Sequence, residues 1–210
     1  MALDTALDIL NAACAVIGAE PLQSLSDEIS GAQSAGLVYE TVTDFNLALE
    51  PFAFAHEFRQ CSRRAAAAAG SGFLYVYDVP GPVLGLPRFL TDDPSDPDAR
   101  FNRYILVGGS VHCDAEDLWA NVKFRPEPNR WAPAFKAATI HALAASLSLS
   151  LASDRNGYEQ LKATAYGTPS EAFRGGMMRA AINENAQATP PRRAHWDNNP
   201  LTRAWRGGDA

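Results

Sequence analysis

Cysteine is scarce in the 210-residue sequence, and the cysteines present form no recognisable motif. Cys14, Cys61 and Cys113 are an odd number at wide spacing. They lack the C-x-x-C spacing of redox and zinc motifs, and they are too few for a disulfide-stapled secreted domain. We therefore interpret them as reduced thiols of a protein that is made in a cytoplasm.

Positive charge is missing from the first fifty residues, which contain eight acidic residues and neither lysine nor arginine. The rest of the chain holds the other 16 of the 24 acidic residues and all 18 lysines and arginines. The formal net charge of -6 therefore arises in the N-terminal region. Because a protein binds nucleic acid through clustered cations that neutralise phosphates, this region is unsuited to reading DNA.

Targeting and membrane segments are absent from the pattern as well. Asp4 and Asp8 stand where a signal peptide carries lysine or arginine. We find no apolar run that approaches the roughly 20 residues of a membrane span. The expectation is a protein that is neither exported by a signal peptide nor anchored in a membrane.

The common catalytic motifs are missing too. The sequence contains neither the G-x-S-x-G of hydrolases, nor the glycine-rich loops of nucleotide-binding proteins, nor the H-E-x-x-H of zinc proteases. His112 and Cys113 are neighbours in a predicted strand, so their side chains point to opposite faces and do not readily share an ion. The aspartates of residues 92–98 lack the glycine and final glutamate of a calcium-binding loop. We expect no enzymatic activity, no metal site and no cofactor.

Apolar residues recur at intervals of three and four in the N-terminal part, which is typical of amphipathic α-helices. The first stripe predicts a helix over residues 3–18 that Gly18 ends. The second predicts a helix over residues 27–50 that ends before Pro51. Two such helices joined by a short loop are expected to pack antiparallel, each covering the apolar face of the other. The stripes consist of Leu3, Leu7, Leu10, Cys14 and Ile17, and of Ala35, Val38, Val42, Phe45 and Leu49.

Strand-forming residues replace this pattern between residues 70 and 128. Residues 73–79 are rich in aromatic and β-branched side chains, and residues 118–124 alternate between apolar and other side chains. Residues 104–113 contain two glycines at the centre, which is typical of a hairpin. The region predicts a small antiparallel sheet inserted between helices. For residues 51–70 a helix extension and an extended lead into the sheet remain equally open.

The C-terminal half returns to a helical pattern. A helix over residues 133–152 begins at a favourable proline and is apolar on most sides, which is typical of a central helix. Helical character continues over residues 154–187, with a break at Gly167-Thr168-Pro169. We therefore predict an α+β protein, mainly a bundle of about four helices with an inserted antiparallel sheet, which forms a single domain over residues 1–187.

The last segment, residues 188–210, has no apolar periodicity and contains three prolines. Such a segment does not bury enough apolar surface to fold alone. Tryptophan and arginine are, however, the side chains that most often anchor protein interfaces. We interpret the segment as an extended C-terminal arm that orders against a partner. Its candidate partner-binding residues are Arg192, Arg193, Trp196, Arg203, Trp205 and Arg206.

Several short motifs are similar, in the same order, to those of one family of phage proteins. Residues 7–11 and 17–25 resemble its opening helix, which ends in isoleucine or leucine, glycine, a small residue and proline before a Ser-Leu turn. Residues 35–45 look like its second helix. Residues 50–55, Glu-Pro-Phe-Ala-Phe-Ala, are similar to its His-Pro-Trp-Asn-Phe-Ala signature.

The later motifs follow the same family. Residues 75–80 look like its aromatic strand, residues 104–114 like its glycine-turned hairpin, and residues 131–151 like its long helix. Residues 177–187 resemble its alanine-rich final helix. Over nearly its whole length the chain thus resembles the head-to-tail adaptors of the tail tubular protein A type, which are structural proteins of tailed bacteriophages.

The resemblance implies a homo-oligomeric ring of twelve copies in the virion, built from chains made in the host cytoplasm. The ring would bind the portal protein on one side and the next tail component, a nozzle, tail tube or terminator, on the other. DNA would pass through its channel only as cargo, and such a channel should not bind phosphate. The candidate DNA-repelling acidic surface is therefore Asp4, Asp8, Asp27, Glu28, Glu40 and Asp44.

Two other functions remain open. The chain could be another ring-forming virion protein, such as a tail completion or terminator protein at the far end of the tail. A less favoured alternative is a small enzyme whose site is assembled from scattered residues such as His56, His141 and Glu159.

Overall fold

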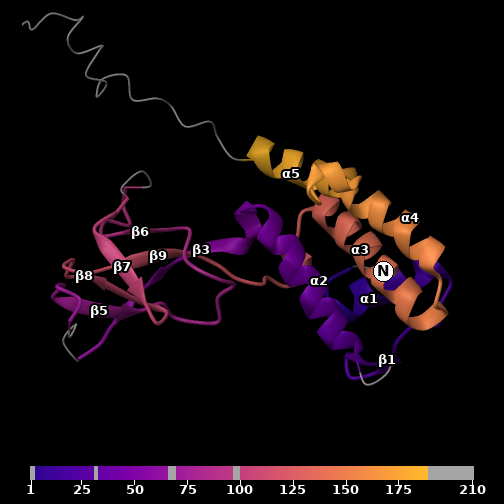
Figure 1. Ribbon diagram of the computed structural model, residues 1–210, viewed down its shortest axis with the longest axis horizontal. Helices are drawn as coiled ribbons and strands as arrows, with labels where there is room; N and C mark the ends of the chain where they lie inside the picture. Colours follow the sequence, from indigo (N-terminus) through magenta and orange to yellow (C-terminus); the bar gives the residue numbers. More distant parts are fainter. Residues whose placement is uncertain (1–2, 31–32, 66–69, 97–99, 189–210) are drawn as a thin grey trace, which may run out of the picture.

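The computed structural model describes residues 3–30, 33–65, 70–96 and 100–188. Within these ranges the chain is an α+β protein, as predicted, with five α-helices and small antiparallel sheets. The helices gather at one end of an elongated molecule and strands β3 to β9 at the other (Figure 1). The helices are α1 (Ala6–Ile17), α2 (Ala35–Leu49), α3 (Pro133–Ala152), α4 (Arg155–Tyr166) and α5 (Gly176–Ala188).

The strands form three sheets, all with antiparallel pairing. β1 (Glu28–Ser30) pairs only with β2 (Gln33–Ser34). A three-stranded sheet has the order β3-β9-β6, and a four-stranded sheet has the order β4-β5-β8-β7. The remaining bounds are β3 (His56–Gln60), β4 (Ser62–Arg63), β5 (Tyr75–Asp78), β6 (Phe89–Thr91), β7 (Tyr104–Val107), β8 (Ser110–Cys113) and β9 (Trp119–Lys123).

Helix α1 follows its sequence signals closely. Its start is capped by Thr5, whose hydroxyl accepts a hydrogen bond from the amide of Asp8 while the Asp8 carboxylate accepts one from the amide of Thr5. Gly18 ends the helix in the left-handed conformation, at φ 70°. The predicted end is therefore confirmed, and the start lies three residues later than predicted.

The second helix begins at Ala35, not at residue 27 as predicted. Glu28–Ser30 and Gln33–Ser34 instead form the paired strands β1 and β2. The hydroxyl of Ser34 accepts a hydrogen bond from the amide of Leu37, so Ser34 is the helix cap. The predicted helix was too long because its apolar stripe starts only at Ala35 and the preceding residues have no helical periodicity.

The partner of α1 also differs from the prediction. The apolar face of α1 packs chiefly against α3, and α1 makes only minor contact with α2. The expectation that these two helices cover each other was therefore wrong. Helical periodicity shows which face is apolar but not which element covers it, and the long apolar α3 offers a larger surface than α2.

The buried stripe of α2 is shifted from the one predicted. The buried residues of α2 are Ala35, Tyr39, Thr43, Asn46 and Leu47. Of the predicted stripe only Ala35 is among them, and Phe45 is 40% exposed. A polar side chain is tolerated on this inward side where hydrogen bonds to other helices satisfy it, as they do for Asn46. Apolar side chains of α2 consequently remain at the surface.

Helix α3 is the central helix, as predicted, and it contacts the other four helices. Pro133–Leu151 is long and apolar enough to cross a membrane by length and composition, so the expectation that no apolar run approaches this length was wrong. Half of that window is buried inside the structure. Its apolar character is accounted for by packing, because Phe135, Ala138 and Leu143 are fully buried.

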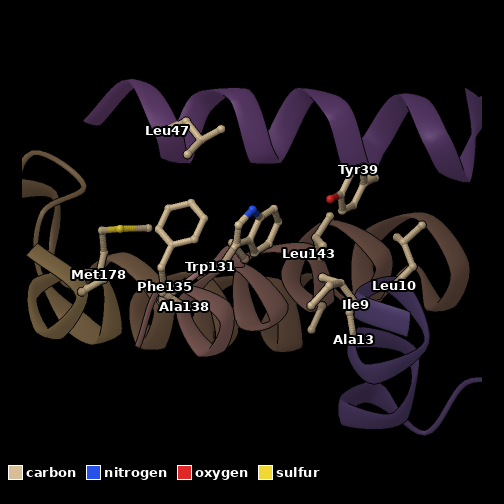
Figure 2. Packing of buried hydrophobic residues seen from close by; sticks show 14 of the residues in the cluster. Ile9, Leu10, Ala13, Tyr39, Leu47, Trp131, Phe135, Ala138, Leu143 and Met178 are labelled. Carbon is tan, nitrogen blue, oxygen red and sulfur yellow. The ribbon is translucent and has the colours of Figure 1, made fainter. Parts of the chain in front are cut away.

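The helical core is built around α3. Figure 2 shows Leu47 and Tyr39 of α2 on one side of α3, with Ile9 and Leu10 of α1 and Met178 of α5 packed around it. Tyr39 is stacked on Trp131 at a ring separation of 6.3 Å, and burial raises the pKa of Tyr39 to about 12. One apolar cluster therefore unites the five helices.

The chain between α2 and the sheets is extended, which decides the alternative left open for residues 51–70 over its described part. After a short 3-10 turn, Ala53–Ala55, strand β3 pairs with β9 from His56 opposite Lys123 to Gln60 opposite Trp119. The β7–β8 hairpin is confirmed, with positive φ at Gly108 and Gly109.

The sheet region contains a strand that was not predicted, an apolar core of its own and a hydrogen bond to the helical part. Strand β6 was not predicted, because three residues are too few for a periodic signal. The strands enclose a second apolar cluster that includes Tyr77, Leu90 and Val111. The Nζ atom of Lys123 donates a hydrogen bond to the carbonyl of Leu47 at 2.8 Å, and this bond ties β9 to α2.

The predicted break within residues 154–187 is confirmed. Helix α4 ends at Tyr166, and Gly167 continues with a positive φ of 75° that favours glycine. A 3-10 turn, Pro169–Glu171, precedes α5. Helix α5 continues to Ala188, one residue beyond the predicted end of the helical region at residue 187.

Candidate partner-binding surface

The predicted arm contributes little to what the structure describes. All six of its candidate partner-binding residues lie in residues 189–210, outside the described part of the chain. A candidate surface must therefore be sought on the helices and sheets.

The six acidic residues of the candidate DNA-repelling surface are not equivalent. Asp4, Glu28 and Glu40 are exposed. Asp8 is engaged in the cap of α1, where hydrogen bonds from Thr5 lower the pKa of its carboxyl. The carboxylate of Asp27 accepts hydrogen bonds from two loop amides at 2.8 and 3.0 Å.

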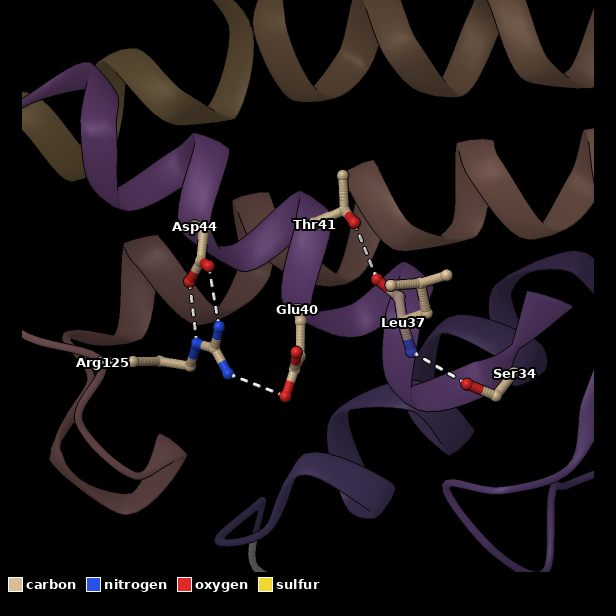
Figure 3. A network of polar contacts seen from close by, with 6 residues as sticks. All are labelled: Ser34, Leu37, Glu40, Thr41, Asp44 and Arg125. Carbon is tan, nitrogen blue, oxygen red and sulfur yellow. Dashed lines mark hydrogen bonds and ion pairs between the residues drawn. The ribbon is translucent and has the colours of Figure 1, made fainter. Parts of the chain in front are cut away.

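The acidic side of α2 is partly neutralised by one arginine. Arg125 donates two hydrogen bonds of 2.7 Å to the carboxylate of Asp44 and lies 3.0 Å from that of Glu40 (Figure 3). The two carboxylates raise the pKa of the Arg125 guanidinium. This partner could not be predicted from the sequence, because 81 residues separate Arg125 from Asp44. The field on this side of α2 is therefore weaker than the count of acids indicates.

The residues considered for chemistry lie apart. His56 is on β3, His141 in the middle of α3 and Glu159 on α4, so the elements that carry His56 and Glu159 lie at opposite ends of the molecule (Figure 1). Among the described residues no three histidine, cysteine or acidic side chains are close enough together to hold a metal ion.

The three cysteines are buried free thiols within the described residues. Burial raises the pKa of the Cys61 thiol to about 11, and it also raises the pKa of the other two. These thiols are therefore protonated at neutral pH and unsuited to nucleophilic attack.

A groove lies between α2 and the C-terminal half of α3 on the helical part. We call it the α2–α3 groove, and its volume is about 400 Å³. Its floor and walls contain two strongly exposed leucines, Leu37 at 53% and Leu149 at 47%. It is lined by Leu37, Val38, Thr41, Val42, Ser146, Leu149, Ser150 and Tyr158.

The hydroxyl groups of this groove are turned back to their own helices. Thr41 donates to the carbonyl of Leu37 at 2.8 Å, as Figure 3 shows, and Ser150 donates to the carbonyl of Ser146 at 2.9 Å. Ser146 donates in the same way to the carbonyl of Ala142 at 3.4 Å. With these protons engaged, the groove presents mainly carbon atoms to a ligand.

Three aromatic rings continue the apolar surface from the groove. Phe45 lies one helical turn beyond Thr41, and its ring meets that of Phe173 edge to face at 5.3 Å. Tyr166 completes the group, 5.8 Å from Phe45 and 5.6 Å from Phe173. A smaller hollow of about 290 Å³ adjoins Tyr166 and Phe173. Leu37, Phe45, Leu149 and Phe173 thus form an apolar track on the helical part.

A second exposed apolar region lies at the sheet end. β7 is an edge strand of its sheet, and three of its consecutive residues, Ile105, Leu106 and Val107, are 39–49% exposed. Successive strand residues point to opposite faces, so both faces of this edge are open. Natural edge strands usually carry charges or proline there, because an unprotected edge invites pairing.

The segment that resembles the adaptor signature joins several helices. Phe52 is buried, and its ring lies 4.8 Å from Phe135 of α3. Asn185 of α5 accepts a hydrogen bond from the amide of Ala53 at 2.8 Å. Glu50, which stands at the position of the family's histidine, forms an ion pair with Arg174. Aromatic contacts, a hydrogen bond to α5 and an ion pair therefore fix this segment in the structure.

No protein-family model matches this chain, and no curated protein matches it.

Proposed function

We propose that the chain is a non-enzymatic head-to-tail adaptor of a tailed bacteriophage. In this proposal it acts as a helical bundle with an inserted sheet and an extended C-terminal arm, and copies of it form a ring beneath the portal. The ring joins capsid to tail and lets DNA pass during ejection. Twelvefold symmetry follows from the resemblance alone.

The observation that carries the proposal is the presence of two separate apolar surfaces on one elongated chain. The apolar track lies on the helical part, and the β7 edge lies at the opposite end (Figure 1). Exposed apolar patches on a folded protein usually mark sites of protein contact. An adaptor needs contacts to its ring neighbours, to the portal and to the next tail component.

Charge supports the passage of DNA without binding. Asp4, Glu28 and Glu40 are exposed and no lysine or arginine lies in the first fifty residues. Because Arg125 neutralises part of α2, we place the repelling role chiefly on the exposed acids near the N-terminus. The arm, with its tryptophans and arginines, would contact the portal or a neighbouring subunit.

The test is electron microscopy of the purified chain mixed with the portal protein encoded in the same genome. We expect a ring of this chain bound to one face of the portal. A chain lacking residues 189–210 should keep its circular dichroism spectrum and lose attachment to portal-bearing heads. A persistent monomer without portal binding would reject the adaptor function.

The same mixture separates the second candidate, a tail completion or terminator ring. That protein should ignore the portal and bind the distal end of the tail tube. An adaptor gene should also lie beside portal and capsid genes. The scattered-residue enzyme has the least support, because its three named residues lie on β3, α3 and α4 without a common site.

A further inference from the structure

We infer that the α2–α3 groove receives the C-terminal segment, residues 189–210, of a second copy of this chain, with a tryptophan seated in it. The inference rests on the proposed function, because it names the contact by which one ring subunit holds the next. The tryptophans available for it are Trp196 and Trp205.

Helix α2 carries apolar side chains that its packing on the helical core does not bury. Its buried side already packs on the helical core, yet Leu37 and Phe45 on another side are 53% and 40% exposed. Leu149 of α3 adds a third exposed side chain across the groove. Single exposed leucines are ordinary, but a lined hollow with several of them is typical of a binding surface.

The size and the lining of the α2–α3 groove suit an indole ring. Its volume of about 400 Å³ is within the usual range of ligand pockets, roughly 300–1,000 Å³. Because the protons of Thr41, Ser146 and Ser150 are engaged by their own helices, these hydroxyl groups can only accept, so the groove suits an apolar ring that also carries a hydrogen-bond donor. An indole ring meets this requirement, and its N–H can reach solvent at the open rim.

Helix α2 and residues 189–210 carry net charges of opposite sign. Helix α2 contains two acidic residues, Glu40 and Asp44, and no lysine or arginine. Residues 189–210 contain four arginines and two aspartates. The side chain of Glu40 is 57% exposed, but it lies on the side of α2 that faces Arg125, away from Thr41 of the groove (Figure 3). Arginines of the segment would therefore meet a helix that carries two acidic and no basic side chains, although neither acid lines the groove.

The position of the end of α5 favours a second copy, rather than the same chain, as the source of the segment. Tyr158 near the start of α4 lines the groove, and the chain then runs along α4 and α5 away from it (Figure 1). Near the end of α5, Asn185 is bonded to Pro51 and Ala53, beyond the far end of α2. Helix α5 therefore ends, at Ala188, on a part of the molecule remote from the groove of the same chain. The 22 residues that follow span up to about 70 Å when extended, which is ample to reach a neighbour.

The experiment uses the full chain with a photoreactive benzoylphenylalanine in place of Trp196 and, separately, of Trp205. Isotope-labelled and unlabelled chains are mixed and irradiated at a series of concentrations, up to the highest at which the chain stays soluble. The crosslinked peptides are then mapped by mass spectrometry. We expect crosslinks between different copies, from at least one of the two positions, to peptides that contain residues 37–45 or 146–158.

A matched set of substitutions tests the groove itself. Leu37→Asp with Leu149→Asp should reduce the inter-copy crosslink about tenfold, since each places a charge in the apolar hollow. The control is Leu86→Asp, which alters a leucine that is 67% exposed outside the groove and should leave the yield unchanged. Circular dichroism and thermal unfolding check that every variant remains folded.

Three results would overturn the inference: crosslinks only within one chain, crosslinks only outside the groove, or a yield that the groove substitutions do not change. An absence of crosslinks from both positions has the same meaning. Any of these would leave ring formation on the portal intact if the microscopy shows it. Conversely, groove crosslinks without portal binding would support this contact and reject the adaptor function.

Discussion

The hydroxyl of Tyr166 donates a 2.6 Å hydrogen bond to Oδ1 of Asn46, which lies 120 residues earlier in the chain. The amide nitrogen of Asn46 donates in turn to Oγ1 of Thr139 at 3.1 Å. Asn46 and Thr139 are fully buried, and burial also raises the pKa of the Tyr166 phenol. One buried polar chain therefore connects α2, α3 and α4.

Tyr166→Phe should lower the free energy of unfolding by about 1–3 kcal/mol, because Oδ1 of Asn46 then has no partner in a buried site. Urea unfolding followed by circular dichroism measures the change. The control is Tyr104→Phe in β7, half-buried and outside this network, which should change stability by less than about 0.5 kcal/mol. Equal losses in the two variants would contradict the role of the network.

The aromatic residues after Pro51 should differ widely in their effect on stability. Phe52 is 1% exposed and packs on Phe54 and Phe135, so Phe52→Ala should cost about 3–5 kcal/mol in the free energy of unfolding. Phe58 is 48% exposed on β3, and Phe58→Ala should cost less than about 1 kcal/mol. Denaturant unfolding of both variants checks the order, and a reversed order would refute this placement of the two rings.

Stability should fall as the pH drops from about 7 to 5, in part because of His56. Burial, assisted by the positive charges of Lys123 and Arg88, lowers the pKa of His56 below its ordinary value of 6.5. In that window the unfolded chain binds a proton that the folded chain does not, so acid favours unfolding until the folded pKa is reached.

His56→Gln should flatten this part of the pH profile of the unfolding free energy. The profile below about pH 4.5 should persist in the variant, since the carboxyls of Asp8, Asp78 and Glu171 have lowered pKa values and lose stabilising interactions when protonated. Thermal unfolding at half-unit pH steps measures both regions. An unchanged slope between pH 7 and 5 in His56→Gln would show that His56 makes no such contribution.

The exposed edge of β7 should promote self-association at high protein concentration. Ile105→Lys combined with Val107→Lys places charges on this edge, so light scattering should show less association, with stability changed by less than about 0.5 kcal/mol. Leu86→Lys is the control, because it adds a charge at an exposed leucine that belongs to no strand. If the control reduces association as much, strand pairing is not the cause.

Structural features that depend on neighbouring residues could be predicted from the sequence. The apolar character and proline start of residues 133–152 predicted the central helix, and the two glycines at 108 and 109 predicted the hairpin turn. The break at Gly167 followed from the glycine and the proline beside it. Each of these depends on backbone preferences or on periodicity within one element, which are properties of the local sequence.

The sequence by itself thus determined the α+β class, most helix ends and the acidic N-terminal region. Only the tertiary structure decided that α1 packs on α3, that Arg125 neutralises Asp44 and Glu40, and that Asn46 faces inward. These contacts join residues far apart in the chain, with 81 positions between Arg125 and Asp44 and 120 between Tyr166 and Asn46. No local pattern specifies the partner of a buried face. The apolar track follows from the same cause, because Tyr39, Asn46 and Leu47 take the inward side of α2, while Leu37 and Phe45 lie on another side.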